Sequence, residues 1–212
     1  MKKLDWVSSD FHTGELLIEG EIALPEGAPK GPPILLLHPH PQRGGDMHNP
    51  LLMVVAGALL ELGRPMMRFN FRGTGRSAGV YDGENEFEEV KSAIDHLMER
   101  YPDLGGVTIV GYSFGGWMGL KASVGEERVS SFVYIAPPFA IFEPVVGVGE
   151  IPLLIVHGES DDFASPEGLE RWRNALPKSA EWRGIPNCDH FFAGHARETA
   201  GIVLEYLSKH GS

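Results

Sequence analysis

The segment 107–117 constrains the fold of this 212-residue chain more than any other. It begins with a β-branched run over 107–110, which is typical of a buried strand, and continues as Gly-Tyr-Ser-Phe-Gly over 111–115. Glycine at both ends of that pattern lets a sharp strand-to-helix turn close, because a side chain at either end would collide with the turn. The segment therefore predicts a turn that lifts the Ser113 hydroxyl over the end of a sheet. A helix should follow over 114–123, with its N-terminal N–H groups beside that hydroxyl.

Strand-like and helix-like patterns alternate along the rest of the chain. Apolar runs predict strands at 34–37, 65–71, 131–136 and 151–156, with a further short segment near 180–183. Helical spacing, caps and breakers predict helices over 50–62, 85–101, 166–176 and 195–207. Two runs within 4–24 indicate an antiparallel edge hairpin. This order predicts an α/β fold with a mostly parallel sheet of about eight strands, helices on both faces, and a single domain over 1–212.

The net charge limits the classes of binding partner, and the cysteine content and the start of the chain bear on the cellular compartment. The formal net charge is −11, which argues against binding to nucleic acid and to anionic membrane surfaces. The single cysteine, Cys188, excludes an internal disulfide and is compatible with a reducing compartment. The start of the chain carries two lysines without an apolar run behind them, so no signal peptide is expected. We expect a cytoplasmic location.

Polar groups follow several of the predicted strands, and parallel strands place such groups at one rim of the sheet. A serine hydroxyl needs a base to become a nucleophile, and an imidazole base needs a carboxylate partner. After Ser113, the strand at 151–156 ends in the acidic loop His-Gly-Glu-Ser-Asp-Asp over 157–162. His190 then lies in the loop before the final helix. The order serine, acid, histidine is that of the α/β-hydrolase fold.

Five stretches together make the chain resemble the α/β-hydrolases over nearly its whole length. It is similar to the small, lid-less serine hydrolases of the esterase branch that includes dienelactone-hydrolase-like proteins. The stretches are His-Pro-His-Pro at 38–41, Asn-Phe-Arg-Gly-Thr-Gly-Arg-Ser at 70–77, Gly-Tyr-Ser-Phe-Gly at 111–115, His-Gly-Glu-Ser-Asp at 157–161 and Asp-His-Phe-Phe at 189–192. The resemblance implies Ser113 as nucleophile, Asp161 as acid and His190 as base.

Two of these assignments have rivals in the sequence. The family pattern His-Gly-x-x-Asp, counted from His157, implies Asp161, whereas the proline that the family often has four residues after the acid, here Pro166, implies Asp162. We favour Asp161 because the strand end fixes its position more rigidly than the loop beyond it. The alternative base is His195, which we place within the final helix and therefore disfavour.

An oxyanion hole needs two backbone N–H groups. One is expected from Phe114, directly after Ser113, and the other from the loop after the strand at 34–37. Pro39 and Pro41 have no N–H, so His40 is left, and it matches the donor position of the family. We expect His38 to brace this loop. The spacing of His38, His40 and His48 matches no zinc pattern, so we expect no metal, and no cofactor is implied.

The resemblance implies a serine hydrolase that cleaves carboxylic esters with small to medium acyl chains through an acyl-enzyme intermediate. Thioesterase, amidase or acyltransferase chemistry with the same triad is the alternative, and a non-catalytic binding module is a further one. The segment 137–150 is too short for a cap domain. The phenylalanines of this segment and those next to His190 could form the apolar walls of a substrate pocket, and Arg43 could bind a substrate carboxylate. The expected substrate-binding residues are therefore Phe139, Phe142, Phe191 and Arg43. Phe114 and Phe192 are further candidates for the apolar walls. We expect Cys188 to be a bystander, the 72–76 loop to be structural, and the glutamates of 84–89 to form a solvated helix face.

Overall fold

The structure, a computed structural model, describes residues 4–210. Residues 1–3, on which the expected absence of a signal peptide partly depends, lie outside the described residues. The strands are β1 (Trp6–Ser8), β2 (Phe11–Thr13), β3 (Leu16–Ile18), β4 (Gly20–Ala23), β5 (Ile34–Leu37), β6 (Met66–Phe69), β7 (Val107–Tyr112), β8 (Val129–Ile135), β9 (Leu153–Gly158) and β10 (Glu181–Ile185). The α-helices are α1 (Pro50–Leu59), α2 (Phe87–Arg100), α3 (Phe114–Ser123), α4 (Pro166–Ala175) and α5 (Ala196–His210), with 3₁₀ turns η1 (Pro41–Arg43) and η2 (Leu60–Leu62).

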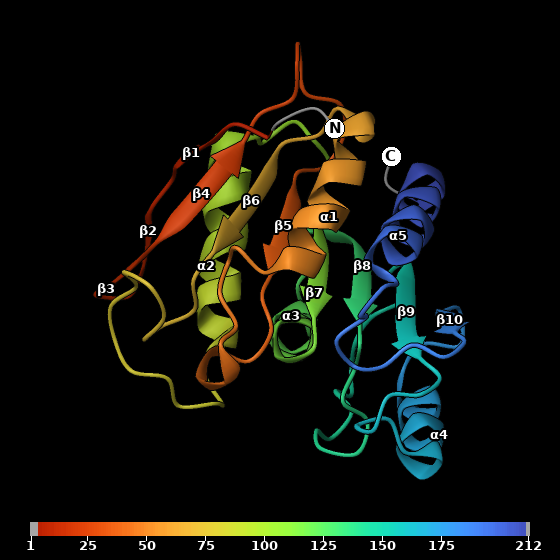
Figure 1. The fold of residues 1–212 in the computed structure, drawn as a ribbon. Helices are drawn as coiled ribbons and strands as arrows, with labels where there is room; N and C mark the ends of the chain where they lie inside the picture. Colours follow the sequence, from red (N-terminus) through yellow and green to blue (C-terminus); the bar gives the residue numbers. More distant parts are fainter. Residues whose placement is uncertain (1–3, 211–212) are drawn as a thin grey trace.

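Eight strands form one sheet in the order β1-β4-β6-β5-β7-β8-β9-β10 (Figure 1). From β6 to β10 every neighbouring pair runs parallel, whereas β4 pairs antiparallel with β6 and β1 antiparallel with β4. The predicted mostly parallel α/β sheet is confirmed. Because parallel strands end at one edge, the loops after β5, β6, β7, β8, β9 and β10 all leave the sheet on the same side.

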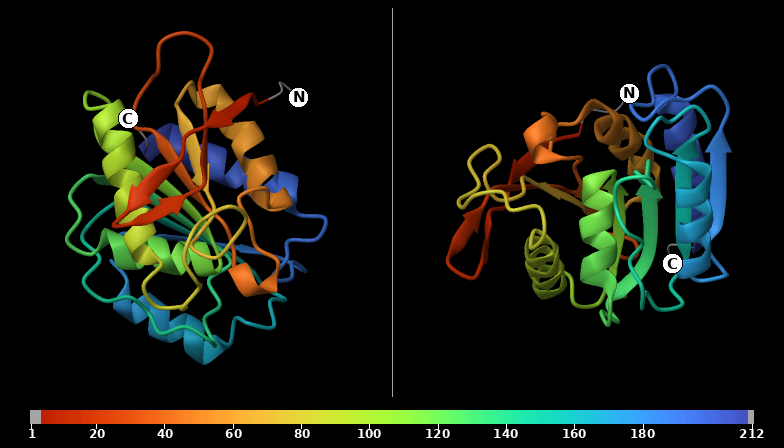
Figure 2. Two further views of the ribbon diagram at one scale, coloured as in Figure 1. Left: turned by 90° about the vertical axis from the view of Figure 1, so that its left-hand side faces the viewer. Right: turned by 90° about the horizontal axis from the view of Figure 1, so that it is seen from below.

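Helices cover both faces of this sheet, as Figure 2 shows in the view from below. The apolar side chains of α1 and α5 pack on one face, and those of α2, α3 and α4 pack on the other. The central strand β7 serves both layers, because Ile109 joins the core under α2 and α3 while Val110 joins the core under α1 and α5. This double burial explains why a strand such as β5, Ile-Leu-Leu-Leu, is a wholly apolar run.

The helix predicted over 50–62 is present as α1 continued by η2. The Asn49 side chain accepts hydrogen bonds from the N–H groups of Leu51 and Leu52, and Pro50 occupies the first turn. Gly63, at φ 63°, ends the segment in the left-handed conformation that glycine adopts without cost. The cap residues of the sequence therefore set both ends of this helix.

The expected antiparallel pair of strands within 4–24 is confirmed at the sheet edge, where β1 pairs antiparallel with β4. Between them, β2 and β3 form a separate two-stranded sheet that was not expected. The second run breaks at Glu19 because its backbone and carboxylate bind the loop after β6. The Glu19 N–H donates to Ser77 Oγ, and its carboxylate accepts from Asn70 and Arg76.

The glutamates of 84–89 are not all solvated, which corrects the expectation of an exposed helix face. Glu86 and Glu89 are fully buried. The carboxylate of Glu86 accepts from the N–H groups of Asp82 and Gly83, and Glu89 forms an ion pair with the buried Arg72. Arg72 also contacts Asp82 and Glu88, at 3.3 and 3.0 Å. These contacts fasten the loop after β6 to the start of α2, so the 72–76 loop is structural, as expected.

Within residues 4–210, no cap domain covers the sheet edge, as the shortness of the segment 137–150 predicts. This segment, between β8 and β9, contains neither helix nor strand. Instead this segment is fastened to its neighbours: the Trp117 indole N–H donates to the Glu143 carbonyl, and the Trp172 indole N–H donates to that of Phe142. In the part of the chain that the structure describes, no helix combines the length and the apolar character needed to cross a bilayer.

Candidate active site

Ser113 lies at the carboxyl end of β7, where the strand turns directly into α3. Its backbone has φ 51° and ψ −115°, a strained conformation for a residue with a side chain. A Cβ on Gly111 would lie 2.4 Å from the Gly116 Cα, which confirms that this glycine lets the turn close. A Cβ on Gly115 would meet the carbonyl oxygens of Leu37 and His38 at 2.5 Å, so this glycine permits close packing on the end of β5.

Two hydrogen bonds connect Ser113, His190 and Asp161, which come from three loops at the same sheet edge. The Ser113 Oγ lies 3.0 Å from His190 Nε2, and His190 Nδ1 lies 2.8 Å from Asp161 Oδ2. All three residues are buried, and the Asp161 side chain is fully so. The hydroxyl of Tyr112 donates to the backbone carbonyl of His190 at 3.0 Å and thereby holds the histidine loop. In this order the carboxylate orients the imidazole, and the imidazole faces the hydroxyl.

The rival residues lie apart from this arrangement. Asp162 is exposed to solvent, whereas Asp161 Oδ1 accepts from the Phe163 N–H at 2.8 Å and its other oxygen faces His190. His195 Nδ1 lies 3.0 Å from the Glu198 carboxylate, at the start of α5. Cys188 is buried next to the histidine loop, and burial raises the pKa of its thiol to about 11. Its thiol is protonated at neutral pH, which suits the expected bystander.

His38 braces the loop after β5, as expected. The ring is fully buried, and this burial lowers its pKa to about 4, so it is neutral at pH 7. Its Nδ1 lies 2.7 Å from the Pro39 carbonyl, and its Nε2 accepts from the Phe71 N–H at 3.1 Å. Both nitrogens are thus engaged, and the ring fixes the peptide that joins Pro39 to His40.

The two N–H groups expected to form the oxyanion hole, those of His40 and Phe114, belong to segments that pack against each other where Gly115 meets His38. Phe114 is the first residue of α3, so its N–H has no partner within the helix. The packing of Gly115 on His38 brings this end of α3 against the loop that carries His40. Since the Pro39–His40 peptide is trans, the His40 N–H points away from the carbonyl that His38 holds.

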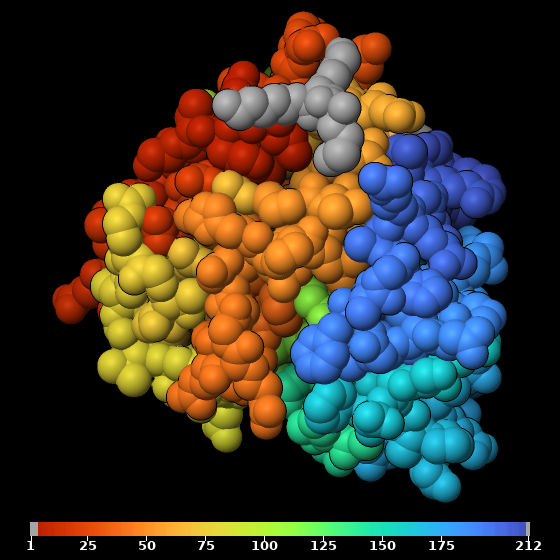
Figure 3. Space-filling view, viewed as in Figure 1, coloured from red at the N-terminus to blue at the C-terminus, as the bar shows by residue number. Residues whose placement is uncertain are grey.

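A cavity of about 340 Å³ opens beside Ser113. In Figure 3 the green of the segment near the end of β7 appears at the floor of a hollow, between the orange loop after β5 and the blue segment before α5. The lining residues are Pro39, His40, Arg43, Gly44, Gly45, Asn49, Tyr112, Ser113, Pro138, Ile141, Phe142, Phe163, His190 and Phe191. Of the expected substrate-binding residues, Phe142, Phe191 and Arg43 line this cavity.

Phe139 does not line the cavity, and its expected role in substrate binding is corrected. It is fully buried and packs edge-on against Trp172 and His157 in the core. Phe114 and Phe192 are likewise buried and absent from the lining. Two aromatic residues that line the cavity, Phe163 and Tyr112, were not expected from the sequence. Phe163 packs edge-on against the His190 ring at 4.8 Å between centroids, and Tyr112 lies beneath the histidine loop.

Arg43 is the cationic group of the cavity. Its side chain is exposed, and it makes no ion pair with any of the residues 4–210 that are described. The described lining holds no acidic side chain. Arg43 and burial together lower the pKa of His40, with burial the larger cause. The cavity therefore combines an aromatic wall with one unpaired positive charge, within a chain of net charge −11.

Comparison with known families agrees with this geometry. The sequence profile described as an alpha/beta hydrolase domain matches residues 33–205, which is most of the chain. The chain belongs to the alpha/beta hydrolase family. The family assignment that the five sequence stretches implied is thereby confirmed, together with the fold.

This hydrolase is similar to several known proteins over nearly its full length. An uncharacterized protein of Rickettsia prowazekii is 29% identical over 211 residues, covering 93% of this chain and 87% of that protein. An alpha-beta serine hydrolase homologue from Coxiella burnetii is 28% identical, with a TM-score of 0.83 and coverage of 98% and 99%. A lid-less serine hydrolase from Xanthomonas campestris, 24% identical, shares the fold with a TM-score of 0.87 over 99% and 96% of the two chains.

Proposed function

We propose that this hydrolase is a serine esterase that cleaves carboxylic esters with small to medium acyl chains. The observation that supports it most is the pair of hydrogen bonds from Ser113 through His190 to Asp161, at the floor of an open cavity. A hydroxyl that faces an imidazole backed by a carboxylate is suited to nucleophilic attack on an acyl carbonyl.

The reaction we propose has two steps. Ser113 Oγ attacks the ester carbonyl while His190 Nε2 takes its proton, and His190 then gives this proton to the leaving alcohol. The acyl-enzyme is cleaved by water, from which His190 again accepts a proton before returning it to Ser113. Asp161 holds the imidazole in the required tautomer and stabilises its positive charge. The N–H groups of His40 and Phe114 donate to the negative oxygen of both tetrahedral intermediates.

Phe142 and Phe191, together with Phe163 and Ile141, offer an apolar wall for the acyl chain. The cavity is small and open to solvent, which suits short and medium chains. A panel of p-nitrophenyl esters from acetyl to dodecanoyl tests this directly, and we expect kcat/KM to peak between acetyl and octanoyl. If no ester is hydrolysed above the background of Ser113→Ala, the proposed activity is wrong.

Arg43 leads us to include esters that carry a second, free carboxylate among the substrates. In Arg43→Gln we expect kcat/KM for such an ester to fall about tenfold relative to its neutral methyl-ester analogue, because a charge-assisted hydrogen bond is lost. Arg183→Gln, which removes an exposed arginine from β10, is the matched control. An unchanged ratio of the two rates in Arg43→Gln would exclude this contact.

Cleavage of thioesters or amides, or acyl transfer, uses the same three groups and is the second candidate. Rates on ester, thioester and amide substrates that share one acyl group distinguish these activities, because such substrates differ only in their leaving group. A non-catalytic binding module is a further alternative, which any turnover dependent on Ser113 excludes. We propose a cytoplasmic location and a small-molecule substrate, with neither nucleic acid nor membrane as partner.

A further inference from the structure

Tyr81 contacts the residue that we propose as an oxyanion donor, although it lies in a loop that the proposed reaction does not use. Its hydroxyl lies 2.9 Å from His40 Nε2, and the two share a hydrogen bond. The Tyr81 ring lies 5.0 Å from the His40 ring and 5.6 Å from that of Phe114, between centroids. The His40 and Phe114 rings are 5.3 Å apart, so the three rings form one cluster. This cluster joins the side chains of both proposed N–H donors.

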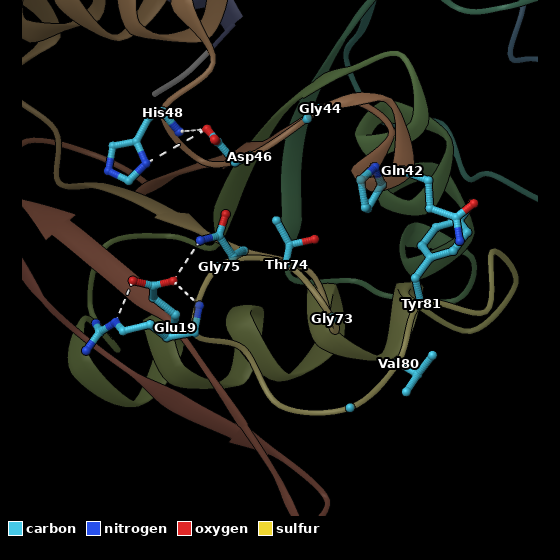
Figure 4. A pocket seen from close by; sticks show the side chains of 15 residues that line it. Glu19, Gln42, Gly44, Asp46, His48, Gly73, Thr74, Gly75, Val80 and Tyr81 are labelled. Carbon is cyan, nitrogen blue, oxygen red and sulfur yellow. Dashed lines mark hydrogen bonds and ion pairs between the residues drawn. The ribbon is translucent and has the colours of Figure 1, made fainter.

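The loop that carries His40 has a second hollow on its other side. Figure 4 shows this cavity, of about 740 Å³, with Gln42 and Tyr81 at one end and Glu19 and His48 at the other. Gly44 and Gly45 line both this cavity and the one beside Ser113. The loop therefore separates two open spaces at Gly44 and Gly45. The N–H groups of Arg43 and Gly45 donate to the His40 carbonyl, at 3.0 and 3.1 Å, and contacts from neighbouring side chains add to this hold on His40.

Two contacts act on the peptide that presents the proposed donor. The His38 ring holds the Pro39 carbonyl at 2.7 Å, which fixes the plane of the Pro39–His40 peptide. Tyr81 holds the side chain of His40, the residue that follows this peptide, by a hydrogen bond and a ring contact with its imidazole. His40 Nδ1 is buried without a hydrogen-bond partner among the described residues, so the bond to Tyr81 is the one polar anchor of this ring.

The segment that carries Tyr81 is itself held firmly. The N–H groups of Asp82 and Gly83, the next two residues, donate to the buried Glu86 carboxylate at 2.8 and 3.1 Å. Asp82 also pairs with the buried Arg72. Glu86 and Glu89, which were expected to be exposed, thus fasten the segment that carries Tyr81 to the start of α2. A rigid support is what a residue needs if it is to fix the position of another.

We infer that Tyr81 is a positioning residue, which holds the His40 loop so that the His40 N–H is placed to stabilise the oxyanion. This inference rests on the proposed function. A donor in a preorganised position acts mainly on the charge that develops in the transition state. Loss of the Tyr81 hydroxyl should therefore weaken transition-state binding while leaving ground-state binding of the ester nearly unchanged.

The test is Tyr81→Phe, which removes the hydroxyl and keeps the ring in its cluster. We expect kcat on the preferred p-nitrophenyl ester to fall about tenfold while KM changes less than about twofold. The inhibition constant of a trifluoromethyl ketone, whose adduct with Ser113 carries the oxyanion, should rise by the same factor of about ten. The control is Tyr101→Phe, which removes a hydroxyl at the far end of α2, where it accepts from Arg100, and should change none of these values.

A Tyr81→Phe enzyme with wild-type kcat and wild-type affinity for the ketone overturns the inference and leaves the proposed function standing. So does a loss of kcat that is accompanied by an equal rise in KM and no change in ketone affinity. If the wild-type protein neither hydrolyses an ester nor reacts with a fluorophosphonate, the proposed function has failed, and the role of Tyr81 fails with it.

Discussion

Replacing His190 by alanine is expected to lower kcat for ester hydrolysis by about 10⁴-fold or more, because no other group then takes the proton of Ser113. The imidazole Nε2 is 3.0 Å from the hydroxyl, and the ring occupies the one place between Ser113 and Asp161. Steady-state kinetics with a p-nitrophenyl ester measure the loss, and thermal unfolding checks that the variant is folded.

His195→Ala is the matched control for this change. His195 lies five residues further along the chain, and its Nδ1 lies 3.0 Å from the exposed carboxylate of Glu198. Its removal should change kcat less than about twofold, since the His195 ring does not line the cavity beside Ser113. Comparable losses in the two variants would contradict the assignment of the base, and a larger loss in His195→Ala would reverse it.

Asp161→Asn should lower kcat by about 10⁴-fold, with little change in fold. An asparagine keeps an oxygen to accept the Phe163 N–H, but the amide group that then faces His190 Nδ1 favours the wrong tautomer of the ring. The negative charge that stabilises the protonated imidazole is lost as well. The measurement is kcat for the same ester, at a pH where the wild type is fully active.

Asp162→Asn provides the comparison, since Asp162 neighbours Asp161 and is exposed. We expect its kcat to stay within about twofold of the wild-type value, because no buried contact is removed. Equal and small effects of the two substitutions would show that neither carboxylate supports the histidine.

The meeting of the Ser113, Asp161 and His190 loops at one sheet edge was predictable, because the sequence pattern that indicates each loop lies within a few residues of it. The glycines around Ser113 dictate a turn, and the end of β9 at Gly158 fixes the place of Asp161 three residues later. The walls of the cavity were less predictable. Phe139 and Phe163 look alike in sequence, and only the path of each loop turns the former into the core and the latter towards His190.

Buried charge was also invisible in the sequence. Glu86 and Glu89 occupy the first turns of a helix, where carboxylates are common on the surface. What buries them is the loop after β6, whose Arg72 and backbone N–H groups supply the partners. The same holds for Tyr81, whose significance depends on a contact with His40 across 41 residues of chain. Tertiary partners of this kind leave no periodic signal.

Reaction with a fluorophosphonate, followed by intact mass spectrometry and peptide mapping, shows whether Ser113 is an activated nucleophile. We expect a single adduct per chain on Ser113, slow labelling in His190→Ala, and no labelling of folded Ser113→Ala. Folded wild-type protein that stays unlabelled, or that carries the adduct on another residue, would exclude Ser113 as the nucleophile.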